Sequence, residues 1–191
     1  DTALRVESRW FDKILRSPEA ANMIRSLFVS MQELNKGARR PAGVPPSNLK
    51  KIGVIGAGFM GAGIAQVSAA AGLQVVLIDR DQETADKGKA GVHKALTDRV
   101  NKGRMRSAER DALLAKITSS GDYGALKDCD LVVEAVFEDR KVNADVIAKI
   151  QAVIRDDAIF ASNTATLPIS SLAAELKDPK RFIGIHFFSA V

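Results

Sequence analysis

The sequence predicts an α/β fold in which a doubly wound, mainly parallel sheet follows a helical connector. Two observations carry this prediction. After residue 47, short apolar runs without polar alternation take turns with segments long enough for crossover helices. Such runs indicate strands buried on both faces, which a parallel sheet covered by helices requires. Before residue 47 the chain offers only helical patterns and a linker, so we expect a helical connector there rather than a second full domain.

Residues 1–46 are predicted to form the helical connector and its linker, and residues 47–191 the sheet domain. Apolar residues recur mostly at helical spacing over 4–15 and again over 20–34, which predicts two helices. The segment 37–48, GARRPAGVPPSN, concentrates Gly and Pro, so no regular element can continue through it. The domain boundary is therefore expected at this linker.

Five strands and five helices are expected in residues 47–191, because short apolar runs alternate with segments of helix length. The strands are expected over residues 51–55, 74–79, 130–135, 158–162 and 182–188. The helices are expected over residues 60–71, 81–101, 107–115, 140–154 and 168–176. This alternation is typical of a sheet with helices on both faces.

The composition narrows the classes of function. With 191 residues the chain can bury one good core. The net charge of +5 is spread along the chain and aromatic residues make up only 5%, which argues against a nucleic-acid partner. A single cysteine, Cys129, excludes an internal disulfide or a cysteine metal site and fits a reducing compartment.

Membrane segments, signal peptides and the ends of the sequence can also be judged from the sequence. No apolar run approaches the roughly 18 residues of a membrane span, and the first residues lack the charged and apolar regions of a signal peptide. The chain starts without Met and stops just after an apolar run, so we expect it to be part of a longer protein.

A glycine-rich turn, VIGAGFMG, follows the first expected strand of the sheet domain. Its glycines, Gly56, Gly58 and Gly61, fit the pattern G-x-G-x-x-G. The first permits a tight turn, the second has no side chain to block a pyrophosphate, and the third lets helix and strand pack closely. The helix that starts there points N–H groups and its positive dipole end at the phosphates. A glycine-rich turn without a ligand is the alternative interpretation.

Asp79 strengthens the interpretation as a dinucleotide site. It lies 18 residues after Gly61, at the end of the second expected strand, near the distance expected for the acid that binds the adenosine ribose. A carboxylate there accepts hydrogen bonds from the ribose diol and repels a 2′-phosphate, so NAD is favoured over NADP. Arg80 weakens this preference slightly because its charge would attract that phosphate.

Four ordered stretches together resemble the 3-hydroxyacyl-CoA dehydrogenase family, and the likeness covers essentially the whole chain. They are KIGVIGAGFMGAGIAQVSAAAGLQVVLIDRD, DLVVEAVFEDRKV, IFASNTATLPI and FIGIHFFSAV. The preceding helices resemble the connector of multifunctional fatty-acid β-oxidation enzymes. The resemblance implies a Rossmann-type NAD-binding domain, with an enoyl-CoA hydratase domain before it and a helical C-terminal dehydrogenase domain after it. It also implies a bacterial cytoplasm, or else an organellar β-oxidation compartment.

The resemblance implies that His186 is the general base. It would take the proton from the 3-hydroxyl of an (S)-3-hydroxyacyl-CoA while C3 passes a hydride to the nicotinamide. Histidine titrates near neutrality, and such a base contributes about 10²- to 10⁴-fold. The alternative is a core histidine on an apolar strand. The glutamate that orients the histidine in this family would lie beyond Val191, so we expect the 191-residue chain to bind NAD with negligible turnover.

The resemblance also assigns cofactor and substrate contacts. Glu138 would lie near the nicotinamide ribose, although a helix-stabilising carboxylate in a first turn is the alternative. Lys102 would contact coenzyme A phosphates, and the alternative is a solvated lysine at a helix end. The full set for the cofactor is Gly56, Ala57, Gly58, Phe59, Met60, Gly61, Asp79, Arg80, Ala135, Val136, Glu138, Asn143, Asn163 and Thr164, and for the substrate Ala165 and Lys102.

Three residues depart from the family pattern. Ala165 stands where a serine usually donates to the reacting oxygen, which could cost about 1–3 kcal/mol unless Thr166 or Ser162 replaces it. Asn143 replaces a lysine near the cofactor, and Ala190 replaces a proline. These departures are also compatible with a non-catalytic dinucleotide-binding module. The sequence is further compatible with a dehydrogenase of a small hydroxy acid. Its sheet edge and its apolar helices are compatible with a homodimer contact.

Overall fold

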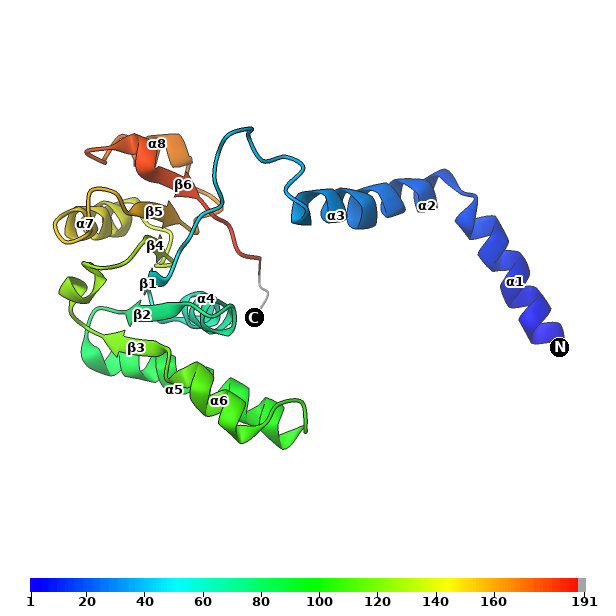
Figure 1. Ribbon diagram of the computed structural model, residues 1–191, viewed down its shortest axis with the longest axis horizontal. Helices are drawn as coiled ribbons and strands as arrows, with labels where there is room; N and C mark the ends of the chain where they lie inside the picture. The colour runs from blue at the N-terminus through cyan, green and yellow to red at the C-terminus, as the bar shows by residue number, and fades with distance from the viewer. Residues whose placement is uncertain (189–191) are drawn as a thin grey trace. The chain divides into compact units, whose positions relative to one another are not determined.

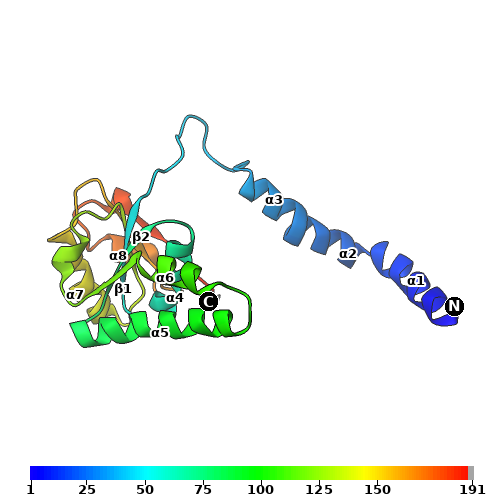
Figure 2. The same ribbon diagram turned by 60° about the horizontal axis from the view of Figure 1, so that its bottom comes forward.

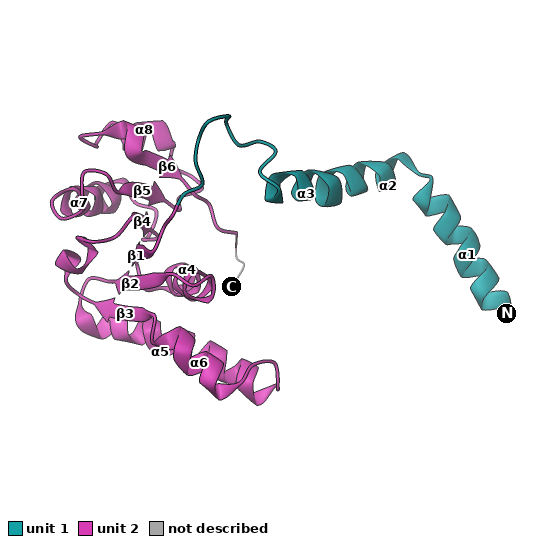
Figure 3. Cartoon of the chain, viewed as in Figure 1, with its two compact units in different colours: residues 1–47 teal, residues 48–191 magenta. Residues whose placement is uncertain are grey.

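The computed structural model describes residues 1–188. The chain divides into two compact units, residues 1–47 and residues 48–191 (Figure 3). Each unit is held together by its own internal contacts.

Unit 1 consists of helices. They are α1 (Thr2–Leu15), α2 (Pro18–Met23), the π-helical segment η1 (Ile24–Val29) and α3 (Ser30–Asn35). Ser17 caps α2, since its Oγ accepts a hydrogen bond from the Ala20 backbone N–H at 3.1 Å. The helix expected over 20–34 is present but widens into π-helical turns at its centre. Its apolar side chains, such as Leu27 and Phe28, are exposed.

Unit 2 is built around a parallel sheet of six strands in the order β3-β2-β1-β4-β5-β6 (Figure 1; the same ribbon is turned by 60° in Figure 2). The strands are β1 (Lys51–Ile55), β2 (Gln74–Ile78), β3 (Ile117–Ser120), β4 (Leu131–Glu134), β5 (Ile159–Ser162) and β6 (Phe182–Gly184). Every neighbouring pair is parallel. The predicted doubly wound fold is confirmed, and the strand order reverses direction at β1, where such folds bind ligands.

Helices cover both faces of the sheet. They are α4 (Phe59–Ala70), α5 (Gln82–Asn101), α6 (Ser107–Leu114), α7 (Arg140–Gln151) and α8 (Ile169–Ala173), with short 3₁₀ turns η2 (Tyr123–Leu126) and η3 (Pro179–Arg181). Successive residues of β1 enter separate cores: Val54 belongs to the same core as Ile64 of α4, whereas Ile55 belongs to the same core as Ile147 of α7. Each such buried aliphatic side chain contributes about 1.5–3 kcal/mol.

Two strands differ from the prediction. The edge strand β3 was not predicted, because its sequence, Ile-Thr-Ser-Ser, is short and polar and only Ile117 is buried. The last strand ends at Gly184 rather than at residue 188. It is the outer strand of the sheet, and after Ile185 donates to the Ser162 carbonyl at 2.9 Å the chain leaves the ladder. Edge strands lack a second neighbour, so their sequence signal is weak.

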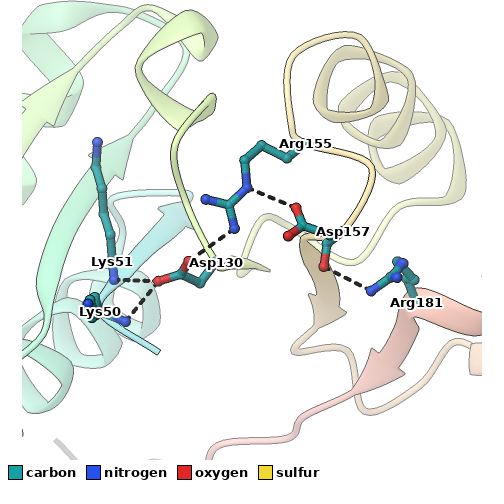
Figure 4. Close-up of polar contacts among 6 residues, drawn as sticks. All are labelled: Lys50, Lys51, Asp130, Arg155, Asp157 and Arg181. Atoms are coloured by element: carbon teal, nitrogen blue, oxygen red, sulfur yellow. Dashed lines mark hydrogen bonds and ion pairs between the residues drawn. The ribbon is translucent and has the colours of Figure 1, made fainter. Parts of the chain in front are cut away.

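A polar cluster joins the strands at the amino edge of the sheet (Figure 4). Asp130, before β4, accepts hydrogen bonds from the backbone N–H groups of Lys50 and Lys51 at 2.8 and 3.0 Å. Arg155 donates to both Asp130 and Asp157, at 3.1 and 2.9 Å. The backbone hydrogen bonds and then Arg155 hold the pKa of Asp130 below its usual range. Charged side chains therefore link the strands at this edge of the sheet. The glycine turn lies at the opposite edge.

Candidate functional site

The glycine turn lies at the carboxyl edge of the sheet, between β1 and α4. Gly56 has φ +93°, and a Cβ there would lie 2.6 Å from the Ala135 carbonyl oxygen. A Cβ on Gly61 would lie 1.6 Å from the Gly56 carbonyl oxygen. Both positions therefore require glycine. Gly58 differs, because a Cβ there would meet nothing within 4 Å; it is the N-cap of α4 and borders open space. The first and third glycines shape the turn, and the second leaves room for a ligand.

Asp79 closes the turn on one side. Its Oδ2 accepts a hydrogen bond from the Ala57 backbone N–H at 2.6 Å, and its Oδ1 accepts one from the Arg80 N–H at 2.8 Å. The carboxylate thus braces the turn, a contact that sequence reasoning missed. Asp79 also lines a pocket of about 560 Å³ together with Ala57, Gly58 and Phe59. Arg80 does not line it, and its Nε pairs with Asp81 at 3.2 Å.

The same pocket continues between α4 and α5, and here sequence reasoning missed several residues. The α5 side contributes small residues, Gly88, Gly91 and Ala95, flanked by the basic Lys87 and Arg99. Small residues recurring at three- or four-residue spacing on a helix with basic neighbours are a signal that could have found them. The predicted Lys102 is the C-cap of α5 and does not line the pocket.

A second pocket, of about 440 Å³, lies on the side of β4 and β5. It is lined by Met60, Glu134, Ala135, Val136, Phe137, Glu138, Asn163 and Thr164. Six of these were predicted, and Glu134 and Phe137 were not. Met60 belongs to the first turn of α4, so the glycine turn separates the two pockets. A dinucleotide whose pyrophosphate sits on that turn would extend one half into each.

Glu138 connects two segments far apart in the sequence. Its Oε1 accepts a hydrogen bond from the Ala165 N–H at 2.8 Å, and its Oε2 accepts one from the Thr166 hydroxyl. The Thr166 hydroxyl and the Ala165 amide hold the pKa of Glu138 below its usual range. The N-cap of α7 is instead Asp139, and α7 has no acidic residue in its first turn. The alternative interpretation of Glu138 as a first-turn carboxylate is therefore wrong.

His186 lies just after β6 beside the second pocket. Its Nδ1 is 3.2 Å from the backbone carbonyl oxygen of Asn163, and the Asn163 side chain accepts from the Phe187 N–H at 2.8 Å. Because a carbonyl only accepts, this contact favours the neutral tautomer with the proton on Nδ1, in which Nε2 carries the lone pair. His186 is exposed, so the alternative of a core histidine is wrong.

A buried polar layer lies between β4, β5 and α7. The Ser162 hydroxyl donates to Glu134 Oε1, and Ser162 Oγ accepts from the Thr164 N–H at 3.3 Å. Burial raises the pKa of Glu134, although the Ser162 hydroxyl and the Val136 amide oppose this. Glu134 Oε2 and both side-chain polar atoms of Asn143 have no hydrogen-bond partner within residues 1–188. Asn143 is only 2% exposed and lines neither pocket.

The residues that depart from the family pattern occupy different surroundings. Ala165 lies in the exposed loop after β5 and offers only its backbone N–H, which is taken by Glu138. The hydroxyls of Thr166 and Ser162 already donate to Glu138 and Glu134, so neither is free to replace the missing serine. Ala190 lies outside the described residues.

Neither a membrane-spanning helix nor a metal cluster occurs in residues 1–188. No helix there is long and apolar enough to span a membrane. No group of three or more His, Cys, Asp or Glu side chains there could hold a metal ion.

Comparison with known proteins shows which protein family the chain resembles. Residues 51–191 match the family model described as 3-hydroxyacyl-CoA dehydrogenase, NAD binding domain. The chain is 39% identical over its full 191 residues to the fatty acid oxidation complex subunit alpha of Pseudomonas putida, and it spans 26% of that protein's length.

Solved structures give the same result. The (S)-3-hydroxybutyryl-CoA dehydrogenase PaaH1 of Ralstonia eutropha is similar at 37% identity with a TM-score of 0.72, and FadB2 of M. tuberculosis at 40% identity with a TM-score of 0.72. Each likeness covers 74% of this chain and 50% of the other. The region matched by the family model contains the glycine turn and both pockets. The chain therefore belongs to the 3-hydroxyacyl-CoA dehydrogenase family and carries its NAD-binding domain.

Proposed function

We propose that this chain supplies the NAD site and the general base for oxidation of an (S)-3-hydroxyacyl-CoA to the 3-oxoacyl-CoA. The observation that carries the proposal is the position of His186, whose Nδ1 is anchored to Asn163, a residue that itself lines the second pocket. The base nitrogen Nε2 is thus left available beside the pocket on the side of β4 and β5. The whole protein would perform the reaction, since the chain spans 26% of its curated relative.

The residues present fit a bound NAD. Gly58 leaves open space at the start of α4, where N–H groups and the helix dipole favour a pyrophosphate. Asp79 in the first pocket would accept from the adenosine ribose diol and repel a 2′-phosphate. The nicotinamide half would then extend into the second pocket, with Glu138 near its ribose. Ala135, Val136 and Thr164 complete the walls of that pocket.

NAD supplies the hydride acceptor for C3 of the substrate. The residues of this chain move the proton and orient the base. Nε2 of His186 accepts the proton of the 3-hydroxyl, and the Asn163 carbonyl holds Nδ1. As the imidazole becomes cationic, the carboxylate of Glu138 would stabilise it, since a positive charge on His186 is among the causes that lower the pKa of Glu138, after Thr166 and Ala165. A positioned base of this kind contributes about 10²- to 10⁴-fold.

The larger assembly is supported by the similarity to a bacterial fatty acid oxidation complex subunit, of which the chain spans 26%. We infer a hydratase domain before residue 1, a helical dehydrogenase domain after residue 191, and a cytoplasmic setting. Residues 1–46 would act as the connector and residues 47–191 as the NAD-binding domain. Acyl-CoA would enter between this domain and the C-terminal one, where Lys102 and Ala165 would face it.

The test is His186→Gln in the whole protein, assayed with a 3-hydroxyacyl-CoA. We expect kcat to fall by about 10²- to 10⁴-fold with little change in NADH affinity, because the glutamine keeps a donor but cannot take a proton. His93→Gln is the matched control, since His93 is the other of the two histidines and lies exposed on α5. Equal losses in both variants, or none in either, would contradict the role of His186.

A second candidate, a non-catalytic dinucleotide-binding module, is favoured by one observation. Ala165 has no hydroxyl, and the nearby hydroxyls of Thr166 and Ser162 already donate to Glu138 and Glu134. Neither can therefore take the place of a serine at position 165. In that case the whole protein would bind NADH and fail to oxidise 3-hydroxyacyl-CoA substrates. The same assay on the unsubstituted protein separates the two functions.

A further inference from the structure

The two pockets differ in the charge of their walls. The first pocket combines Asp79 with the basic Lys87 and Arg99. The second contains Glu134 and Glu138, and none of the described residues that line it is basic. Its nearest cationic neighbours along the chain, Arg140 and Lys141 of α7, line a different pocket. The described lining of the second pocket therefore contains two acidic side chains and no basic one.

The two acids of this pocket are fixed in place. Glu138 is held by the Ala165 amide and the Thr166 hydroxyl, donors that favour its ionised form. Glu134 is 3% exposed and is held on one oxygen by the Ser162 hydroxyl, while Oε2 has no partner among residues 1–188. A fixed acceptor acts on a ligand charge more strongly where water is excluded, as at Glu134, than at an exposed position such as Glu138.

We propose that Glu134 and Glu138 make the second pocket selective for the oxidised cofactor over the reduced one. The nicotinamide ring is cationic in NAD⁺ and neutral in NADH, whereas the rest of the molecule is unchanged. Glu138, held in its ionised form by two donors, therefore stabilises only the cationic ring. Glu134, whose pKa burial raises, adds to this effect when it is ionised. This inference rests on the proposed function, which places the nicotinamide half in this pocket.

The ratio of the two dissociation constants isolates this effect, because contributions of the phosphates and the adenosine cancel in it. The 191-residue chain is titrated with NADH by fluorescence, and NAD⁺ is measured by competition. All titrations are made in one buffer at pH 8. The variants are Glu138→Gln and Glu134→Gln, which keep the side-chain shape and remove the charge.

We expect Kd(NAD⁺)/Kd(NADH) to rise by about threefold or more in Glu138→Gln, and in the same direction in Glu134→Gln. Asp156→Asn is the control, because Asp156 lies in the loop between α7 and β5, at the opposite edge of the sheet. Circular dichroism verifies folding. If the buried Glu134→Gln variant unfolds, the exposed Glu138→Gln variant and the salt dependence of the wild-type ratio, which we expect to rise with ionic strength, still test the idea.

The outcomes are distinct. Binding of both cofactor forms with an unchanged ratio in Glu138→Gln would overturn the selectivity and leave the NAD site intact. Absence of binding of either form by the folded wild-type chain would overturn the proposed NAD site, and with it this inference.

Discussion

The two pockets on either side of the glycine turn are built in different ways. The first, with Asp79, is formed by consecutive elements β1, α4, β2 and α5. The second draws together the ends of β4 and β5, and its glutamate Glu138 is held by residues 27 and 28 positions away. The first pocket is therefore built from elements that follow one another along the chain, and the second from elements that are far apart in the sequence.

Alanine substitutions in the glycine turn between the two pockets give the largest expected effect. Gly61→Ala forces a Cβ to 1.6 Å from the Gly56 carbonyl, so we expect about 1–3 kcal/mol of lost stability or more and a loss of NADH binding. Gly58→Ala meets nothing within 4 Å, and we expect it to leave stability nearly unchanged while weakening NADH. Chemical denaturation and NADH titration measure both effects. Equal loss of stability in the two variants would show that the turn has a different shape.

A smaller effect is expected at the amino edge, away from both pockets. Asp130→Asn removes a carboxylate that accepts from Lys50, Lys51 and Arg155, so we expect about 1–2 kcal/mol of lost stability at pH 7. NADH affinity should not change. Asp156→Asn, at the same edge, is the control.

The pH dependence of the Asp130 effect has a definite sign. The folded-state pKa of Asp130 is lowered, mainly by the backbone N–H groups of Lys50 and Lys51, so its stabilisation is present above the unfolded pKa of about 3.9. It is lost as pH falls through the folded pKa. Denaturation midpoints of wild type and Asp130→Asn should therefore converge below about pH 4. If the two midpoints still differed by the same amount at about pH 2, the charge of Asp130 would not be the source of its stabilising effect.

The contrast between the pockets also explains what the sequence could predict. The strand over 51–55, the glycine turn and Asp79 follow from local spacing, and the structure has them at those residues. The strand β3 was missed because Thr118, Ser119 and Ser120 need little burial at a sheet edge. No local signal marked these residues as strand.

The remaining site features depend on tertiary contacts. The brace between Ala57 and Asp79, the hold of Ala165 and Thr166 on Glu138, and the Glu134–Ser162 pair each join separate elements. Asn143 was expected at the cofactor, but α7 turns it toward the interior, where it is buried. Which face of a helix meets a sheet end is set by packing, so a motif position alone could not reveal it.

The most direct test of the NAD site is a titration of the chain with NADH and NADPH, beside Asp79→Ala and the control Asp156→Ala. Asp79 lines the first pocket and would meet the adenosine ribose. The account predicts that NADH binds more tightly than NADPH, and that Asp79→Ala weakens NADH and reduces or abolishes that preference while the control does not. A folded wild-type chain that binds neither cofactor, or binds both equally, would contradict it.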